Sequence, residues 1–170
     1  MASTHEPQEA GLVESVRVVT LNLNIDLPCG AASDAVVRHA ITEEQPDIIC
    51  FQEALWIAHG THQAMSILAG FGYHIVHQFD VQPRPDRNPG GQQYGTVIAS
   101  RWPIAHSEVV PLPSTERGAG FPRALQAAEI TAPPPVGRLL IVNPKVGDTA
   151  VTACHRLAVT YMKMLRCKLP

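Results

Sequence analysis

Two residues that can bind a cation stand near the ends of predicted strands. Glu53 follows the unbroken apolar run at residues 48–51 in "PDIICFQEAL", and Asn22 lies near the end of "VRVVTLNLN". Mg²⁺ is usually held by one or two carboxylates, with water and substrate phosphate completing its coordination shell. Apolar residues that precede a carboxylate lower the local dielectric constant and so strengthen its attraction for a cation. If the two strands pair side by side, Glu53 and Asn22 could form a magnesium site.

The residues alone leave a plainer interpretation open. Glu53 could be a solvated strand end and Asn22 a turn residue, because exposed carboxylates and turn-forming asparagines are common. On spacing alone, this plainer interpretation is favoured over metal binding.

The composition indicates one globular domain. The chain has 170 residues, of which 45% are hydrophobic and 16% charged, which is enough to form a sizeable core. The formal net charge of -2 excludes a general attraction to nucleic acid or to anionic membranes. A phosphate contact would therefore have to come from a local cluster of residues.

The cysteine pattern favours a reducing, cytoplasmic setting. The four cysteines lie far apart and form no CxxC pair, which argues against a zinc site. The first residues lack the pattern of a signal peptide, and no apolar run approaches the roughly 20 residues that span a bilayer. We therefore expect no transmembrane segment.

The hydrophobic pattern predicts seven strands and three helices in a domain at 15–170, after a disordered tail at 1–14. The strands are expected at 16–24, 47–53, 73–79, 94–100, 104–110, 123–130 and 138–143, and the helices at 34–45, at 61–69 and from about 149 onward. Ser33 and Thr61 are expected to start the first two helices, and Gly70 to follow the second. Short loops between the later strands predict a mixed, mostly antiparallel sheet.

Several segments together resemble the N-terminal half of the endonuclease/exonuclease/phosphatase superfamily. This superfamily is similar in fold to deoxyribonuclease I and includes nucleases and lipid or sugar-phosphate hydrolases. The segments are "VTLNLN", "PDIICFQEAL", "GGQQYGTVIASRWPI", "RALQAAEI" and "LLIVN", which match in that order. The resemblance implies an α+β fold that is part of a four-layer α/β/β/α sandwich.

The resemblance also implies a site and a reaction. Glu53 and Asn22 would correspond to metal-site residues for Mg²⁺ or Mn²⁺. Tyr94 would lie near the scissile phosphate, and Arg123 would be a possible anion contact. The implied reaction is hydrolysis of a phosphate ester, with nucleic acid, phospholipid and sugar phosphate not distinguished as substrates.

The chain departs from the family pattern toward its C-terminus. Pro144 follows "LLIVN" where members carry a histidine, and neither "GD-x-N" nor "SDH" occurs; the only Gly-Asp pair, at 147–148, continues as "TA". These motifs supply the catalytic Asp and His and belong to a half of the fold that we expect to be missing. We therefore expect activity to be weak or absent.

Three interpretations remain open at this stage: a hydrolase by descent, a non-catalytic binding module, and a truncated product of an early stop or a shifted reading frame. We also expect one face of the sheet to be covered by the helices at 34–45 and 61–69 and the other to have lost its partner sheet. Such an uncovered face predicts a dimer, a partner protein or poor solubility.

Overall fold

The structure, a computed structural model, describes residues 15–23, 31–58, 61–78, 94–111 and 124–144. These form two helices and eight strands. In chain order they are β1 (Val18–Asn22), α1 (Ala31–Glu44), β2 (Ile48–Ala58), β3 (Thr61–His62), α2 (Gln63–Leu68), β4 (His74–Gln78), β5 (Tyr94–Ser100), β6 (Ile104–Pro111), β7 (Ala124–Thr131) and β8 (Arg138–Pro144).

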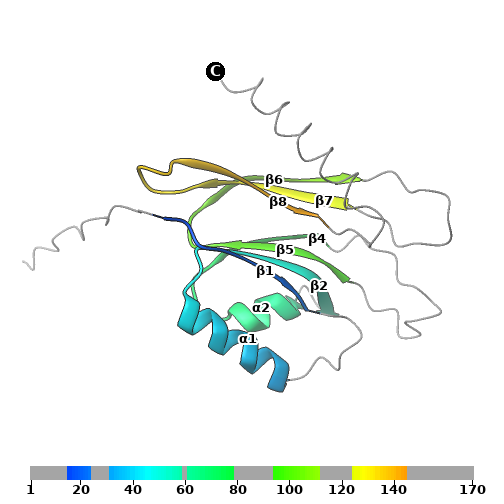
Figure 1. Cartoon of the computed structure of the whole chain (residues 1–170). Coiled ribbons are helices and arrows are strands. Elements are labelled where there is room, and N and C mark those ends of the chain that lie inside the picture. Colours follow the sequence, from blue (N-terminus) through cyan, green and yellow to red (C-terminus); the bar gives the residue numbers. More distant parts are fainter. Residues whose placement is uncertain (1–14, 24–30, 59–60, 79–93, 112–123, 145–170) are drawn as a thin grey trace, which may run out of the picture.

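The described elements form three layers (Figure 1). The helices α1 and α2 lie against one face of a first sheet with strand order β1-β2-β5-β4, and β3 pairs with β2 outside this path. A second sheet, β6-β7-β8, stacks on the opposite face. Among the described strands, only β1 and β2 pair in parallel, and the other pairs are antiparallel. The α+β, mostly antiparallel fold predicted from the sequence is confirmed.

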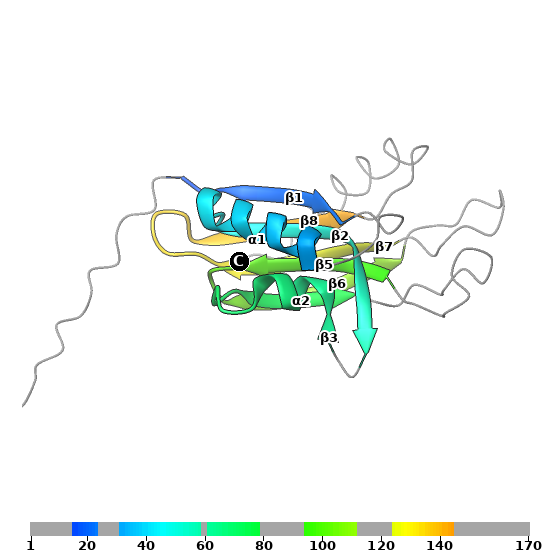
Figure 2. The same cartoon turned by 90° about the horizontal axis from the view of Figure 1, so that it is seen from below.

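The first core lies between the helices and the first sheet. The view from below shows α1 and α2 lying across this sheet (Figure 2). Alternate residues of β2 point to this side, and Ile49 and Phe51 are buried here. They pack with Ile41 from α1 and Ile67 from α2. The apolar side of α1 and the short helix α2 therefore cover the middle of this face of the first sheet.

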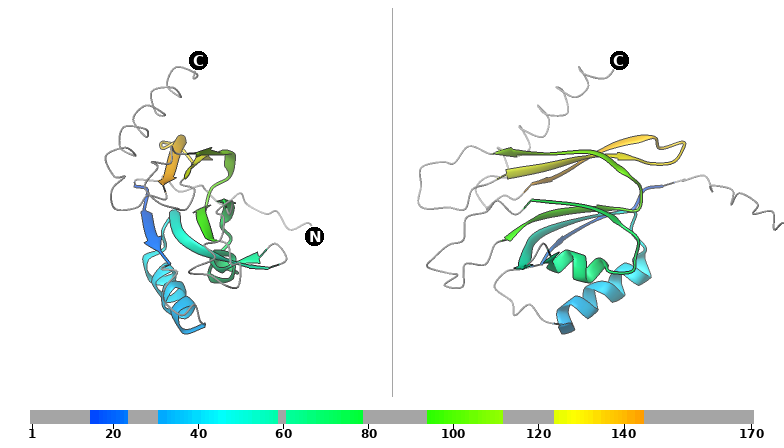
Figure 3. Two further views of the ribbon diagram at one scale, coloured as in Figure 1. Left: turned by 90° about the vertical axis from the view of Figure 1, so that its right-hand side faces the viewer. Right: turned by 180° about the vertical axis from the view of Figure 1, so that it is seen from behind.

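The second core lies between the two sheets and corrects one prediction. Ile48, Cys50 and Ile98 of the first sheet pack against Ala128 and Ile130 of the second. The face that we expected to have lost its partner sheet is therefore covered by β6–β8 (Figure 3). The prediction was wrong because the last three described strands form a separate sheet that folds over the first one.

The boundaries of both helices also differ from the prediction. α1 begins at Ala31, so Ser33 lies inside the helix and does not precede it. Residues 61–62 form β3, and His62 takes the N-cap position of α2 that we assigned to Thr61. Gly70 does follow α2, with a φ of 85°, as a left-handed residue after a helix requires.

Several predicted features lie outside the described residues. These are the tail at 1–14, the helix expected from about 149 onward and Arg123. Within the described part of the chain, no helix is long and apolar enough to cross a membrane.

His62 is a fully buried histidine that caps a helix. Its Nδ1 accepts a hydrogen bond from the backbone N–H of Met65 at 3.2 Å, and its ring lies edge-on to that of His77, with 5.0 Å between centroids. Burial, and secondarily the charge of His77, lowers the pKa of His62 to about 4. The ring is therefore neutral in the folded state near neutral pH.

The lowered pKa predicts a loss of stability in mild acid. The unfolded chain takes up a proton at His62 below about pH 6.5, whereas the folded chain resists this until about pH 4. The free energy of unfolding should therefore fall by about 2 kcal/mol from this residue between about pH 7 and pH 5. Denaturant melts of the wild type and of His62→Gln at both pH values measure the difference.

The matched control is His39→Gln, because His39 is exposed on α1. This variant should keep the wild-type pH dependence. An equal fall in wild type and His62→Gln would contradict the assignment.

Candidate functional site

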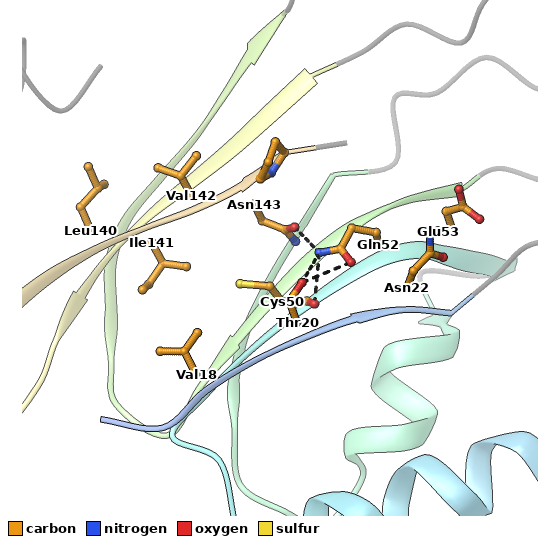
Figure 4. Close-up of a pocket in the computed structure, with 11 residues that line it drawn as sticks. Val18, Thr20, Asn22, Cys50, Gln52, Glu53, Leu140, Ile141, Val142 and Asn143 are labelled. Carbon is orange, nitrogen blue, oxygen red and sulfur yellow. Dashed lines mark hydrogen bonds between the residues drawn. The ribbon is translucent and has the colours of Figure 1, made fainter. Parts of the chain in front are cut away.

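Asn22 and Glu53 lie on neighbouring strands and line the same cavity (Figure 4). β1 runs parallel to β2 with Asn22 opposite Gln52, which brings the end of β1 beside Glu53. The cavity has a volume of about 560 Å³ and opens between β1, β2 and β8. The side-by-side pairing on which the predicted metal site depended is therefore present.

A β-bulge turns Glu53 toward this cavity. Phe51 pairs with Val97 and Ala54 with Gly95, so Gln52 and Glu53 together oppose the single residue Thr96. By strict alternation Glu53 would share the helix-covered face with Phe51. The extra residue allows both Gln52 and Glu53 to line the cavity, while Ala54 returns to the first core.

The bulge places Glu53 in a strained backbone conformation. Its φ is 56°, in the left-handed region that side-chain-bearing residues rarely adopt. Such a conformation costs about 1–3 kcal/mol and is concentrated at functional sites. Glu53 is half-buried and is the only carboxylate among the described residues that line the cavity.

Gln52 joins the two sheets through a polar network that the sequence pattern did not predict. Its Nε2 donates to Thr20 Oγ1 at 3.0 Å and to Asn143 Oδ1 at 2.7 Å. These contacts hold β1, β2 and β8 together directly beside Glu53. The only sequence signal for this network was the presence of an amide at the end of each of two apolar strands.

Asn143 is the central member of this network. Its side chain is 1% exposed, and its Nδ2 donates to the carbonyl oxygens of Phe51 at 2.9 Å and Val97 at 3.1 Å. Both carbonyls belong to the first sheet, at the point where the bulge interrupts the ladder. Asn143 therefore fixes the second sheet over the bulge that carries Glu53.

The cavity has a polar end and an apolar end. Asn22, Glu53 and the network gather at one end (Figure 4). The other end is lined by apolar residues of β1 and β8, among them Val18 and Ile141. Cys50 also faces it, and burial raises the pKa of this thiol to about 11, so the thiol is protonated and unreactive near neutral pH.

Of the two remaining predicted site residues, the structure describes only Tyr94, and this residue does not line the cavity. Tyr94 is buried at the start of β5, opposite Leu55, and is not among the residues that line the cavity. Arg123 lies outside the described residues. Within the described ranges, no three His, Cys, Asp or Glu side chains gather into a metal-binding group.

A family model described as "Endonuclease/Exonuclease/phosphatase family" matches residues 19–152. No curated protein matches the chain. Among solved structures, an endonuclease/exonuclease/phosphatase from Beutenbergia cavernae is 24% identical, with a TM-score of 0.60, over 77% of this chain and 38% of that one.

Two further solved structures share the fold. A family protein from Leptotrichia buccalis is 14% identical, with a TM-score of 0.60, over 78% of this chain and 55% of that one. TDP2 from Caenorhabditis elegans is 18% identical, with a TM-score of 0.58, over 91% of this chain and 44% of that one. The chain thus spans about two-fifths to just over half of these proteins.

The role of Asn143 predicts a large effect of its removal. Asn143→Ala leaves two buried carbonyl oxygens without this donor, so the free energy of unfolding should fall by about 2–4 kcal/mol. Asn143→Asp should cost more near neutral pH, because a carboxylate cannot donate to the carbonyls of Phe51 and Val97. Denaturant melts measure both changes.

At acid pH the free energies of unfolding of Asn143→Asp and Asn143→Ala should become more similar, since a protonated carboxyl regains one donor. Ser107→Ala, at an exposed position on β6, is the control and should be nearly neutral. A cost below about 1 kcal/mol for Asn143→Ala would show that the sheets do not depend on this side chain.

The positive φ of Glu53 predicts that the glycine variant is more stable than the alanine variant at this position, the reverse of the usual order in a strand. Glycine is normally less stable than alanine in a strand by about 0.5–1 kcal/mol. At position 53 the left-handed backbone favours glycine, so Glu53→Gly should be about 1 kcal/mol more stable than Glu53→Ala. The same pair of substitutions at Glu108 in β6 should show the ordinary order, and that order at position 53 would contradict the bulge.

Proposed function

Because the chain belongs to the endonuclease/exonuclease/phosphatase family, we propose that it is a metal-dependent phosphoesterase by descent, with Glu53 and Asn22 as metal ligands. The observation that supports this proposal is the convergence of these two side chains on one cavity of about 560 Å³. The reaction, phosphodiester or phosphomonoester hydrolysis, is proposed from the family as a whole.

The donors at this site suit a hard cation. A carboxylate oxygen of Glu53 and an amide oxygen of Asn22 are the ligand types that Mg²⁺ or Mn²⁺ takes in phosphate-handling sites, where water and substrate supply the rest. A bound ion would neutralise charge on the phosphoryl oxygens. The opening of the cavity between β1 and β8 leaves room for a phosphate ester beside this pair.

The chain's own residues would position and orient the metal ligand. The hydrogen bonds of Gln52 to Thr20 and Asn143 hold the residue next to Glu53 in the bulge, so the backbone that carries the Glu53 carboxylate would be held in place before a ligand binds. Tyr94 and Arg123 remain proposed contacts near the phosphate. A fixed ligand set lowers the cost of ordering the site when a cation arrives.

We propose phosphate esters as the substrate class without choosing among nucleic acid, phospholipid and sugar phosphate. The solved D. rerio TDP2 contains a single-strand DNA product, and the human Nocturnin catalytic domain contains a sulfate anion. Both are ligands with tetrahedral oxyanion groups, which fits the proposed class. We also propose a reducing, cytoplasmic setting, because the four cysteines lie far apart in the sequence and form no CxxC pair.

The proposed activity of this chain is weak. Its sequence has Pro144 after "LLIVN" and lacks "GD-x-N" and "SDH", so the acid–base residues that the family resemblance implies have no counterpart. Losing such groups removes several powers of ten in rate. The alternative function, a binding module, is favoured by the outer side of β1, which pairs with no other described strand and carries exposed apolar side chains.

Metal titration tests the proposed site independently of activity. Calorimetric titration of Mn²⁺ into the full chain should show binding that Glu53→Gln abolishes and that Asn22→Ala weakens at least about tenfold, or 1.4 kcal/mol. Mn²⁺ should also raise the melting temperature of the wild type, since a ligand of the folded state stabilises it. Turnover of a chromogenic phosphodiester should be negligible with Mg²⁺ or Mn²⁺.

Glu108→Gln is the control, because Glu108 lies on β6 and does not line the cavity. It should leave the titration unchanged. Equal Mn²⁺ binding by the wild type and Glu53→Gln would support the binding module instead. Fast turnover abolished by Glu53→Ala would show that the chain retains a complete catalytic site.

A further inference from the structure

β1 is an edge strand whose outer side is open in the described part of the chain. The sheet order places β1 at the end of the first sheet, and β2 is its only neighbour among the described strands. The carbonyl oxygen of Arg17 and the N–H of Leu23 bond to β2 and the segment before it. Backbone groups alternate along a strand, so those of Val18 and Thr20 point away from β2.

Exposed apolar side chains gather at this edge. Three of the five large apolar residues that are exposed in the described chain lie here: Val18 (52%) and Val19 (37%) on β1, and Val36 (69%) on α1. An exposed edge strand with apolar side chains is a site for pairing with another strand. The first sheet thus presents both hydrogen-bonding groups and apolar surface along one side.

A second cavity opens beneath the same edge. It has a volume of about 230 Å³, lies between α1 and the first sheet, and is lined almost entirely by apolar residues. Val19 and Val36 are among them, so two of the exposed valines border it. Apolar side chains that arrive alongside β1 would enter this cavity and be removed from water.

We propose that two copies of this chain pair antiparallel through β1, about a two-fold axis at Val19. In this register Val18 of each copy lies opposite Thr20 of the other, and both residues direct their backbone groups outward. The two Val19 side chains meet on the axis, on the face that α1 covers. The first sheets of the two copies then form one continuous sheet.

The second copy fits because the edge is self-complementary. In a two-fold interface the same surface serves both subunits, and the outward N–H and carbonyl groups of Val18 and Thr20 satisfy one another. The surface buried by pairing one five-residue strand is smaller than that of a stable interface, which is about 1,200–2,000 Å². The exposed face of α1 around Val36 supplies further apolar contact on the same side.

The inference goes beyond the proposed hydrolysis and does not depend on it. It also moves the interface that we expected on an uncovered sheet face to the edge of the sheet. The edge lies beside the cavity that holds Glu53, so pairing would set the two candidate sites next to each other on one face.

Sedimentation equilibrium of the full chain over a range of concentrations tests the proposal. The wild type should be a dimer, and Val36→Lys and Val18→Pro should each raise its dissociation constant at least about tenfold. Lysine is a better helix former than valine, so Val36→Lys should not weaken the monomer. Proline at the first residue of an edge strand removes an outward N–H while sparing the pairing with β2.

Met65→Lys and Val109→Lys are matched controls, because these residues are 41% and 39% exposed but lie on α2 and β6. Both should leave the dissociation constant unchanged. Amide hydrogen exchange at Thr20 should slow as the dimer forms, whereas that of Leu21 should not change.

Three outcomes would overturn the proposal. In the first, the wild type remains monomeric up to about 1 mM protein, so that its association free energy is weaker than about 4 kcal/mol. Another is a dimer that responds equally to Val36→Lys and Val109→Lys. A monomer with a slowly exchanging Thr20 amide would show that the edge is covered within one copy.

Discussion

The hydrogen bonds of Asn143 are the interaction on which the candidate site depends. Its amide reaches from the second sheet to two carbonyl oxygens of the first, and it accepts from Gln52. A buried amide in an apolar interface is tolerated only when its polar atoms have partners, so one position of β8 over β2 is strongly preferred. The position of β8 over β2 in turn forms the walls of the larger cavity, which β1, β2 and β8 line.

The bulge converts this alignment into a site. One extra residue in β2 turns Glu53 out of the helix-covered face and into the cavity, at the cost of a left-handed backbone. A carboxylate held in this way beside the apolar interior attracts a cation more strongly than one on a mobile, solvated strand end. Local strain and long-range packing therefore act on the same residue.

The two sheets do not cover each other evenly. β6–β8 stack over the middle of the first sheet, where Ile48 and Ile98 are fully buried, whereas β1 remains at the margin with exposed valines. This uneven cover explains why both cavities described above border β1. It also leaves the exposed valines of β1 at the edge where we propose dimerisation.

The sequence by itself indicated seven of the eight described strands and the family, and it singled out Asn22 and Glu53 as a candidate pair. Apolar runs that end in polar residues identify strands, and β5 has the bounds predicted for it. Only the tertiary structure decided that the second sheet covers the first, that β2 contains a bulge and that Gln52 and Asn143 form a network. Alternation along β2 would assign Glu53 to the wrong face, because a bulge depends on the pairing with β5. The bond between Gln52 and Asn143 joins residues 91 positions apart, a proximity that no local pattern encodes.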